Sequence, residues 1–209
     1  MLYTDSLSRS WLDAEIKAGS LDHYVQTGRN VLAIIITVTK KTQGLLDLIK
    51  ICGSFALALP SSAPFASDHQ QDALSPNVTA PYHLVKPVTT VDTGLWNRNG
   101  YPYFSGTGIF RRTVSLPESL SGKAIMLEVD CGRDVLEVRV NGLDAGLCLW
   151  RPSQVDISRL IRPGENEIEI MVTNTLINVL EAVEQDSGLH SARIVTYNRF
   201  ELDTLAEED

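Results

Sequence analysis

Cysteine and histidine are scarce in this chain of 209 residues, which has three cysteines and four histidines. Cys52, Cys131 and Cys148 lack the spacing of a zinc site, and three cysteines cannot all pair within one chain. Cys131 and Cys148 flank an expected hairpin, so a disulfide between them stays open beside an interpretation as two buried thiols. No histidine has a metal-type neighbour. We therefore expect no cofactor, with a structural calcium held by loop oxygens as the open alternative.

Positive charge is also scarce, because 18 Lys and Arg face 26 Asp and Glu, for a formal net charge of −8. Such a chain has no broad basic face for phosphates, so we expect no nucleic-acid partner. The most apolar run, residues 31–38, has eight residues, whereas a membrane span needs about 20. The first eleven residues lack the basic and apolar regions of a signal peptide. We expect no membrane partner, and the compartment stays open.

Common catalytic signatures are missing. No serine lies in a Gly-x-Ser-x-Gly motif, and no glycine-rich phosphate loop occurs. The chain is too short for a (β/α)8 barrel, which needs roughly 250 residues. Asp130 with Asp134 or Glu137 would be candidate paired carboxylates, but their spacing around a turn favours a solvated surface. We expect no catalytic residue in the chain itself, and whether it is part of an enzyme stays open.

What the sequence does contain changes in character along the chain. The first part ends in two apolar, β-branched runs, residues 31–38 and 48–59, which predict buried strands. A stretch with five of the nine prolines and no glycine follows and is typical of a surface connector. The predicted organisation is a partial β-sandwich segment at 1–59, a linker at 60–93, a β-sandwich at 94–203 and an acidic tail at 204–209.

The third of these zones predicts an antiparallel sandwich, because short alternating segments are separated by turns and long helical patterns are few. Asn141-Gly142 favours a type I′ hairpin, since both central residues of that turn take φ > 0. Residues 176–186 are the best helix candidate. The expected strands are residues 108–116, 124–130, 135–140, 167–174 and 192–202.

An internal repeat links the first zone to the third. Residues 24–37 and 160–173 share a glycine, an asparagine two positions later and an apolar strand-like run that ends in threonine. A turn glycine and a polar turn residue reverse the chain before a buried strand. Because a second matching block follows in the same order, duplication is favoured over chance similarity between strands. The matching positions are Gly28 and Gly164, Asn30 and Asn166, Thr37 and Thr173, and Gly44 and Gly188.

Short motifs follow one another in a fixed order through residues 94–203. They are Gly100-Tyr101-Pro102-Tyr103-Phe104-Ser105-Gly106-Thr107-Gly108, Asn141-Gly142, Val155-Asp156-Ile157, Pro163-Gly164-Glu165-Asn166 and Val172-Thr173-Asn174-Thr175. This series resembles the galactose-binding-like jelly-roll domains of large glycoside hydrolases, in particular accessory β-sandwiches of family 2 and of the family 106 α-L-rhamnosidases. Residues 20–59 resemble the closing half of a preceding domain of the same type. Residues 176–187 depart from the pattern.

The resemblance implies a module appended to a secreted or periplasmic glycosidase whose catalytic barrel this chain lacks. The expected fold is all-β, an antiparallel jelly-roll β-sandwich with trailing strands of a second, incomplete sandwich. Because natural proteins cover exposed sheet edges, the incomplete part is expected to pack on the sandwich, to swap between chains or to form a homodimer. The leading hypothesis is a non-catalytic module that binds an oligo- or polysaccharide. The alternatives are a structural or oligomerisation domain without sugar binding, and a fragment of a glycosidase.

A sugar site combines aromatic faces with a few polar groups that fix orientation, so we looked for aromatics beside Asn, Asp and Arg in loops. The densest cluster precedes the first long strand of the sandwich, and two other loops carry polar side chains alone. The candidate ligand-binding residues are Trp96, Asn97, Asn99, Tyr101, Tyr103, Asp130, Arg133, Asn174 and Asn178.

Each candidate also has a structural interpretation. Trp96 and Tyr103 would cover the end of the sandwich core, because aromatic side chains bury large areas. Arg133 would pair with Asp134, and the two asparagines would cap local backbone groups. For Trp150-Arg151, after the hairpin, packing at a sheet edge is favoured over contact with a ligand.

Overall fold

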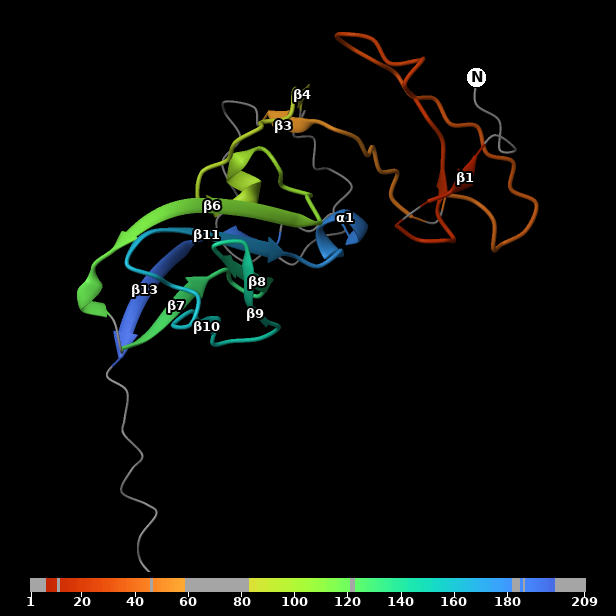
Figure 1. The fold of residues 1–209 in the computed structure, drawn as a ribbon. Coiled ribbons are helices and arrows are strands. Elements are labelled where there is room, and N and C mark those ends of the chain that lie inside the picture. Colours follow the sequence, from red (N-terminus) through yellow and green to blue (C-terminus); the bar gives the residue numbers. More distant parts are fainter. Residues whose placement is uncertain are drawn as a thin grey trace, which may run out of the picture. The chain divides into compact units, whose positions relative to one another are not determined.

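The computed structural model describes residues 7–10, 12–45, 47–58, 83–120, 123–181, 185 and 187–197. The chain divides into two units, a first unit of residues 1–49 and a second unit of residues 50–209 (Figure 1). The expected acidic tail and residues 60–82 of the expected linker lie outside the described residues.

The second unit is an all-β sandwich of antiparallel sheets, as the sequence predicts. Its four-stranded sheet has the order β6 (Thr107–Leu116), β11 (Gly164–Thr173), β8 (Val135–Val140) and β9 (Leu143–Cys148). Its three-stranded sheet has the order β10 (Gln154–Asp156), β7 (Ala124–Asp130) and β13 (Ser191–Tyr197). Two short pairs are β12 (Gly188–Leu189) with β5 (Gly94–Leu95), and β3 (Ala56–Ala58) with β4 (His83–Val85). The described helices are α1 (Ile177–Glu181) and the 3-10 turns Trp96–Asn99 and Glu118–Leu120.

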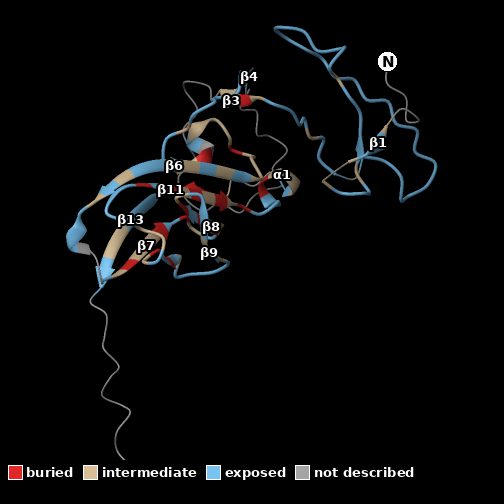
Figure 2. Cartoon of the chain, in the orientation of Figure 1, coloured by how far each residue is buried: buried red, intermediate tan, exposed pale blue. Residues whose placement is uncertain are grey.

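The core lies between the two larger sheets (Figure 2). Side chains alternate between the two faces of a strand, and the central strands place an apolar residue at every second position. Burying such side chains contributes about 1.5–3 kcal/mol each, so this alternation is the main force that holds the sheets together. The inward residues are Ile125, Leu127 and Val129 of β7, Leu136, Val138 and Val140 of β8, and Ile168, Ile170 and Val172 of β11.

The turn between β8 and β9 is the predicted hairpin. Asn141 has φ 53° and Gly142 has φ 79°, the left-handed backbone that the Asn-Gly pair favours. The Asn141 side chain donates to the Leu160 carbonyl at 2.9 Å and to the Asn166 side chain at 3.0 Å. The hairpin is therefore tied to the turn that precedes β11, and the two turns fix one another.

Most of the other expected elements are confirmed near their expected bounds, including the helix over residues 177–181. Two expectations at the sandwich's entry are wrong. Within the described residues 48–58, the expected strand is limited to β3. The last part of the expected linker forms β4, which pairs with β3. The Leu57 amide also donates to the Gly100 carbonyl at 2.8 Å, which ties β3 to the sandwich.

The first unit has one described strand pair, β1 (Ser8–Arg9) with β2 (Lys17–Ala18). The strand expected over residues 31–38 does not form in the described structure, and Val31 and Ile35 are 82% and 85% exposed. A strand is stabilised by neighbours that accept and donate its backbone hydrogen bonds, and among the described residues none pairs with this segment. The apolar segment that was expected to form trailing strands therefore has no sheet partner among the described residues.

Candidate functional site

A cleft of about 520 Å³ opens at one end of the sandwich, between the β7–β8 loop and the segment that joins β9 to β10. It is lined by Val129, Asp130, Cys131, Gly132, Arg151, Pro152 and Ser153. A smaller hollow of about 220 Å³ shares three of these residues and is lined further by Arg133, Asp134, Leu149 and Trp150. The two hollows share Gly132, Arg151 and Ser153, and we call them together the loop-end cleft.

The loop between β7 and β8 forms a hydrogen-bonded turn. The Asp130 side chain accepts a hydrogen bond from the Gly132 amide at 3.2 Å, and the Asp134 amide donates to the Cys131 carbonyl at 3.2 Å. An aspartate that bonds the amide two residues on mimics a backbone turn, and Gly132 has φ 65°. The sequence from Asp130 to Asp134 therefore reverses the chain and presents Arg133 to solvent.

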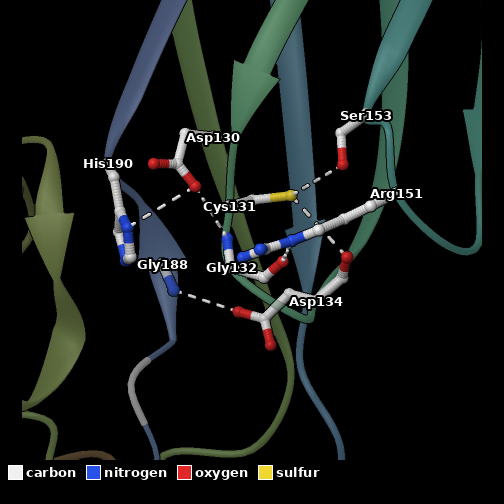
Figure 3. A network of polar contacts seen from close by, with 8 residues as sticks. All are labelled: Asp130, Cys131, Gly132, Asp134, Arg151, Ser153, Gly188 and His190. Carbon is white, nitrogen blue, oxygen red and sulfur yellow. Dashed lines mark hydrogen bonds and ion pairs between the residues drawn. The ribbon is translucent and has the colours of Figure 1, made fainter.

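The segment between β9 and β10 forms the opposite wall of the cleft, and its Arg151 side chain contacts the β7–β8 loop. Arg151 Nε donates to the Gly132 carbonyl at 2.9 Å, and Figure 3 shows the Arg151 side chain reaching across to the Asp130–Gly132 turn. Its neighbour Trp150 is 77% exposed. The cleft thus offers an open aromatic face beside two guanidinium groups, one from each wall.

Arg133 does not make the ion pair with Asp134 that its spacing suggests. It is exposed and has no ion pair with the residues that the structure describes. Asp134 is 8% exposed and accepts hydrogen bonds from the Gly188 amide at 3.0 Å and from the Ser187 hydroxyl at 3.4 Å. Burial raises the pKa of the Asp134 carboxyl, and the Gly188 and Ser187 bonds oppose this shift. Asp134 therefore anchors β12 from within the fold.

Two further groups lie around the cleft. Cys131 is 1% exposed, with its Sγ 3.6 Å from the Asp134 carbonyl and 3.9 Å from Ser153 Oγ. Burial raises the pKa of this thiol, and a neutral, covered thiol is a poor nucleophile. Cys131 and Cys148 are both free in the structure, so the alternative disulfide is absent. His190 Nδ1 lies 3.8 Å from Asp130 Oδ1.

The aromatic cluster expected to bind sugar lies elsewhere and is largely packed. Trp96 is 4% exposed and contacts Phe104 edge-on, with ring centroids 5.1 Å apart. It has no open face for a sugar ring because it fills the core, as the structural interpretation expects. Tyr101 packs against the same core and donates its hydroxyl to the Val88 carbonyl at 2.9 Å. Tyr103 is half-buried.

The candidate asparagines mostly serve the fold. Asn99 donates to the Leu95 carbonyl at 3.1 Å, and the Asn97 side chain lies outside what the structure describes. Asn174 accepts from the Gly106 amide at 2.8 Å and donates to the Phe104 carbonyl at 2.8 Å. Asn178, on α1, is 2% exposed, and its Oδ1 has no hydrogen-bond partner among the described residues. Buried amides that satisfy neighbouring backbone groups hold loops in place.

Of the eight candidates whose side chains the structure describes, Asp130 and Arg133 line the loop-end cleft and the other six do not. Trp150 and Arg151, for which the sequence favoured packing at a sheet edge, also line it, as does Ser153, which was not a candidate. The signal for them was present, because antiparallel pairing of Leu136 with Cys148 across the hairpin brings the segments on either side to the same end of the sheet.

Among the described residues we find neither a group of metal-ligating side chains nor a membrane-spanning helix. No three His, Cys, Asp or Glu side chains among them gather to hold a metal ion. No described helix is long and apolar enough to cross a membrane.

These features define an all-β sandwich with an open cleft at its loop end, and comparisons with known proteins place it beside glycoside hydrolases. No family model matches the sequence. Over 84 residues, 39% of this chain, it is 36% identical to a Formosa agariphila protein named "Putative beta-glucuronidase", of which the match covers 7%. This similarity supports a glycoside hydrolase-related domain.

Similar solved structures belong to the same enzyme class. A rhamnosidase from Novosphingobium sp. PP1Y is 22% identical with a TM-score of 0.43, and the match covers 79% of this chain and 16% of that one. A Bifidobacterium dentium β-glucuronidase is 20% identical with a TM-score of 0.37, over 42% of this chain and 15% of that one. This chain spans less than a fifth of each of these proteins.

Proposed function

We propose that the second unit is a non-catalytic carbohydrate-binding module, a galactose-binding-like jelly roll that accompanies the catalytic part of a glycosidase. One observation carries this proposal: the loop-end cleft presents Trp150, 77% exposed, beside the exposed side chains of Arg133 and Arg151. A large exposed aromatic side chain at a cleft that also offers hydrogen-bond donors is the composition of a ligand site.

The chemistry of a saccharide fits this arrangement. One face of a pyranose ring is made of C–H groups, which pack on an aromatic ring, and its hydroxyl groups are read by planar polar side chains. Arg151 is a donor on the same wall as Trp150, and Asp130 is an acceptor on the opposite wall. The similarity to a β-glucuronidase supports the same class of ligand.

The cleft does not support glycoside hydrolysis by this unit. Glycosidases place two carboxyl groups about 5–9.5 Å apart on either side of the scissile bond. The carboxylates that line the cleft are Asp130 and Asp134, on one loop. Because Asp134 is buried and bonded to the Gly188 amide, it is not free to face Asp130 across a substrate. The catalytic residues of the parent enzyme would lie outside this chain.

A structural role is the second candidate, and the first unit favours it. Gly28 and Asn30 repeat the turn of Gly164 and Asn166, and a long apolar segment follows with its side chains exposed. We propose that residues 1–59 contain the closing strands of a second jelly roll, whose partner strands would cover this segment. A complex of the parent enzyme or a homodimer would supply such strands.

Isothermal titration of the 209-residue protein against mono- and oligosaccharides at millimolar concentration tests the binding role. We expect measurable binding that is lost in Trp150→Ala. Tyr197→Ala is the matched control, because Tyr197 is a half-exposed aromatic residue that pairs with Ala124, at the other end of β7 from the cleft. An absence of binding to every sugar would leave only the structural role. Binding that survives Trp150→Ala unchanged would mean that the sugar site lies away from the loop-end cleft.

A further inference from the structure

We propose that the saccharide held in the loop-end cleft carries an anionic group, a carboxylate or a sulfate, which Arg133 and Arg151 bind while the sugar ring packs on Trp150. This inference rests on the proposed carbohydrate-binding function and names the class of sugar.

The two arginines of the cleft lie together in one hollow, and no carboxylate of the described residues neutralises either of them. Three arginines of the sandwich lie in ion pairs, Arg111 and Arg139 with Glu169 and Arg193 with Glu128. Arg133 and Arg151 have no such pair among the described residues, although acidic residues outnumber basic ones by 26 to 18. Both line the smaller hollow of the cleft.

Neither of the nearby carboxylates, Asp130 and Asp134, forms an ion pair with Arg133 or Arg151 in the described structure. Asp130 Oδ1 accepts the Gly132 amide at 3.2 Å and lies 3.8 Å from His190 Nδ1. Asp134 turns into the fold and accepts the Gly188 amide (Figure 3). The guanidinium groups are consequently left to meet an anion from solvent.

A hydrogen bond to the backbone fixes the orientation of the Arg151 guanidinium. Its Nε–H is used by the Gly132 carbonyl at 2.9 Å, which fixes the direction of the guanidinium and leaves its terminal N–H groups as donors. Arg133 comes from the opposite wall. A planar guanidinium binds carboxylate and sulfate oxygens through paired, charge-assisted hydrogen bonds. Two guanidinium groups in one hollow with an exposed aromatic side chain match a sugar ring with one charged substituent.

The size and charge of the surroundings favour a short saccharide over a long polyanion. The hollow lined by Arg133, Trp150 and Arg151 has a volume of about 220 Å³, and the hollow that shares Arg151 with it has about 520 Å³, so the space suits a small ligand. The net charge of −8 disfavours approach of a long polyanion such as nucleic acid. One carboxylate or sulfate on a small sugar meets mainly the local charge of the two arginines.

Matched ligands separate the charge from the sugar. The full-length protein is titrated at low salt with methyl β-glucuronide, methyl β-glucoside and glucose 6-sulfate, because the first two differ only in the carboxylate and the third carries sulfate. We expect an anionic sugar to bind about tenfold or more tightly than the glucoside, as one charge-assisted interaction provides. Added salt should weaken the anionic sugar only. The preferred anion shows whether carboxylate or sulfate is bound.

Arginine variants then locate the charge. Arg133→Gln and Arg151→Gln should each weaken the anionic sugar about tenfold and leave the glucoside within about twofold. Arg133→Gln is the cleaner variant because Arg133 has no described hydrogen bond or ion pair to lose. Arg112→Gln removes the same charge from β6, the far edge of the four-stranded sheet from β9, and should leave all three affinities unchanged.

Each result decides a separate claim. Equal binding of glucoside and anionic sugars, with loss in Trp150→Ala, would overturn the anionic ligand and keep the sugar site. Anionic binding that Arg112→Gln weakens as much as Arg133→Gln would also overturn it, since general charge attraction would then suffice. Binding of none of the sugars would remove both the inference and the proposed function.

Discussion

Asn30 and Asn166, which lie in separate units of the chain, make the same three hydrogen bonds to their own turns. Asn166 accepts from the Arg162 amide at 3.0 Å and donates to the carbonyls of Arg162 and Gly164 at 2.7 and 3.0 Å. Asn30 bonds the equivalent groups of Gln26 and Gly28 at 3.0, 2.8 and 3.0 Å. The repeated turn therefore forms with and without a sheet beyond it.

Substitution of these two asparagines should have unequal consequences. Asn166 is 1% exposed and also accepts from Asn141, so Asn166→Ala leaves several buried groups unpaired and should cost about 3 kcal/mol. Asn30 is exposed, water replaces its bonds, and Asn30→Ala should cost under about 1 kcal/mol. The free energy of unfolding from urea titrations checks both values.

Equal costs for the two variants would contradict this account. A large cost for Asn30→Ala would mean that the first unit is buried against a partner in solution, as the proposal of a second jelly roll expects for the parent protein. Asn141→Ala serves as a further control, because it removes bonds from the same buried turn and should lower stability in the same direction as Asn166→Ala.

The second prediction concerns two tryptophans. Trp96, a candidate for ligand binding, is buried, whereas Trp150, for which packing was favoured, is exposed. Trp96→Ala should destabilise the sandwich by about 3–5 kcal/mol, because a core aromatic side chain leaves a large cavity. Trp150→Ala should change stability by less than about 0.5 kcal/mol, as is usual for an exposed residue. Urea titrations of both variants, with acrylamide quenching of the wild-type fluorescence, measure the difference. A stable Trp96→Ala protein would place that side chain at the surface.

The contrast between Trp96 and Trp150 shows where sequence reasoning succeeds and where it stops. Alternating apolar residues and the Asn141-Gly142 turn define the strands, because both act through local geometry and one buried face. Which aromatic residue is buried depends on packing from distant segments: a Cβ on Gly108 or Gly188 would lie 2.7 or 3.1 Å from the Trp96 ring. Only glycines leave room for that ring, and their distance from Trp96 along the chain hides the relationship.

The same limit applies to the cleft and to the first unit. The cleft joins two loops that are separated by a hairpin, so its residues share no sequence motif, although the hairpin register predicts their proximity. Residues 31–38 have the composition of a strand, but a strand is stable only when neighbouring strands accept and donate its backbone hydrogen bonds. Its composition predicts what it becomes beside partner strands, and those strands are not among the described residues.

The third prediction concerns acid stability. Burial raises the pKa of Asp134 in the folded protein above its value in the unfolded chain, so the folded state holds the proton more tightly. Protonated Asp134 therefore stabilises the fold at pH values below the ordinary aspartate pKa of about 4, and this contribution is lost as the pH rises through the folded pKa. Asp134→Asn, which keeps an oxygen acceptor for the Gly188 amide and does not titrate, should remove that pH dependence.

Urea titrations of wild type and Asp134→Asn between pH 3.5 and 7 measure the effect. The difference in the free energy of unfolding, wild type minus variant, should fall as the pH rises and level off once Asp134 is ionised. A difference that rises with pH for Asp134→Asn would mean that the bonds from Gly188 and Ser187 outweigh burial and that the carboxylate is the favoured form in the folded protein.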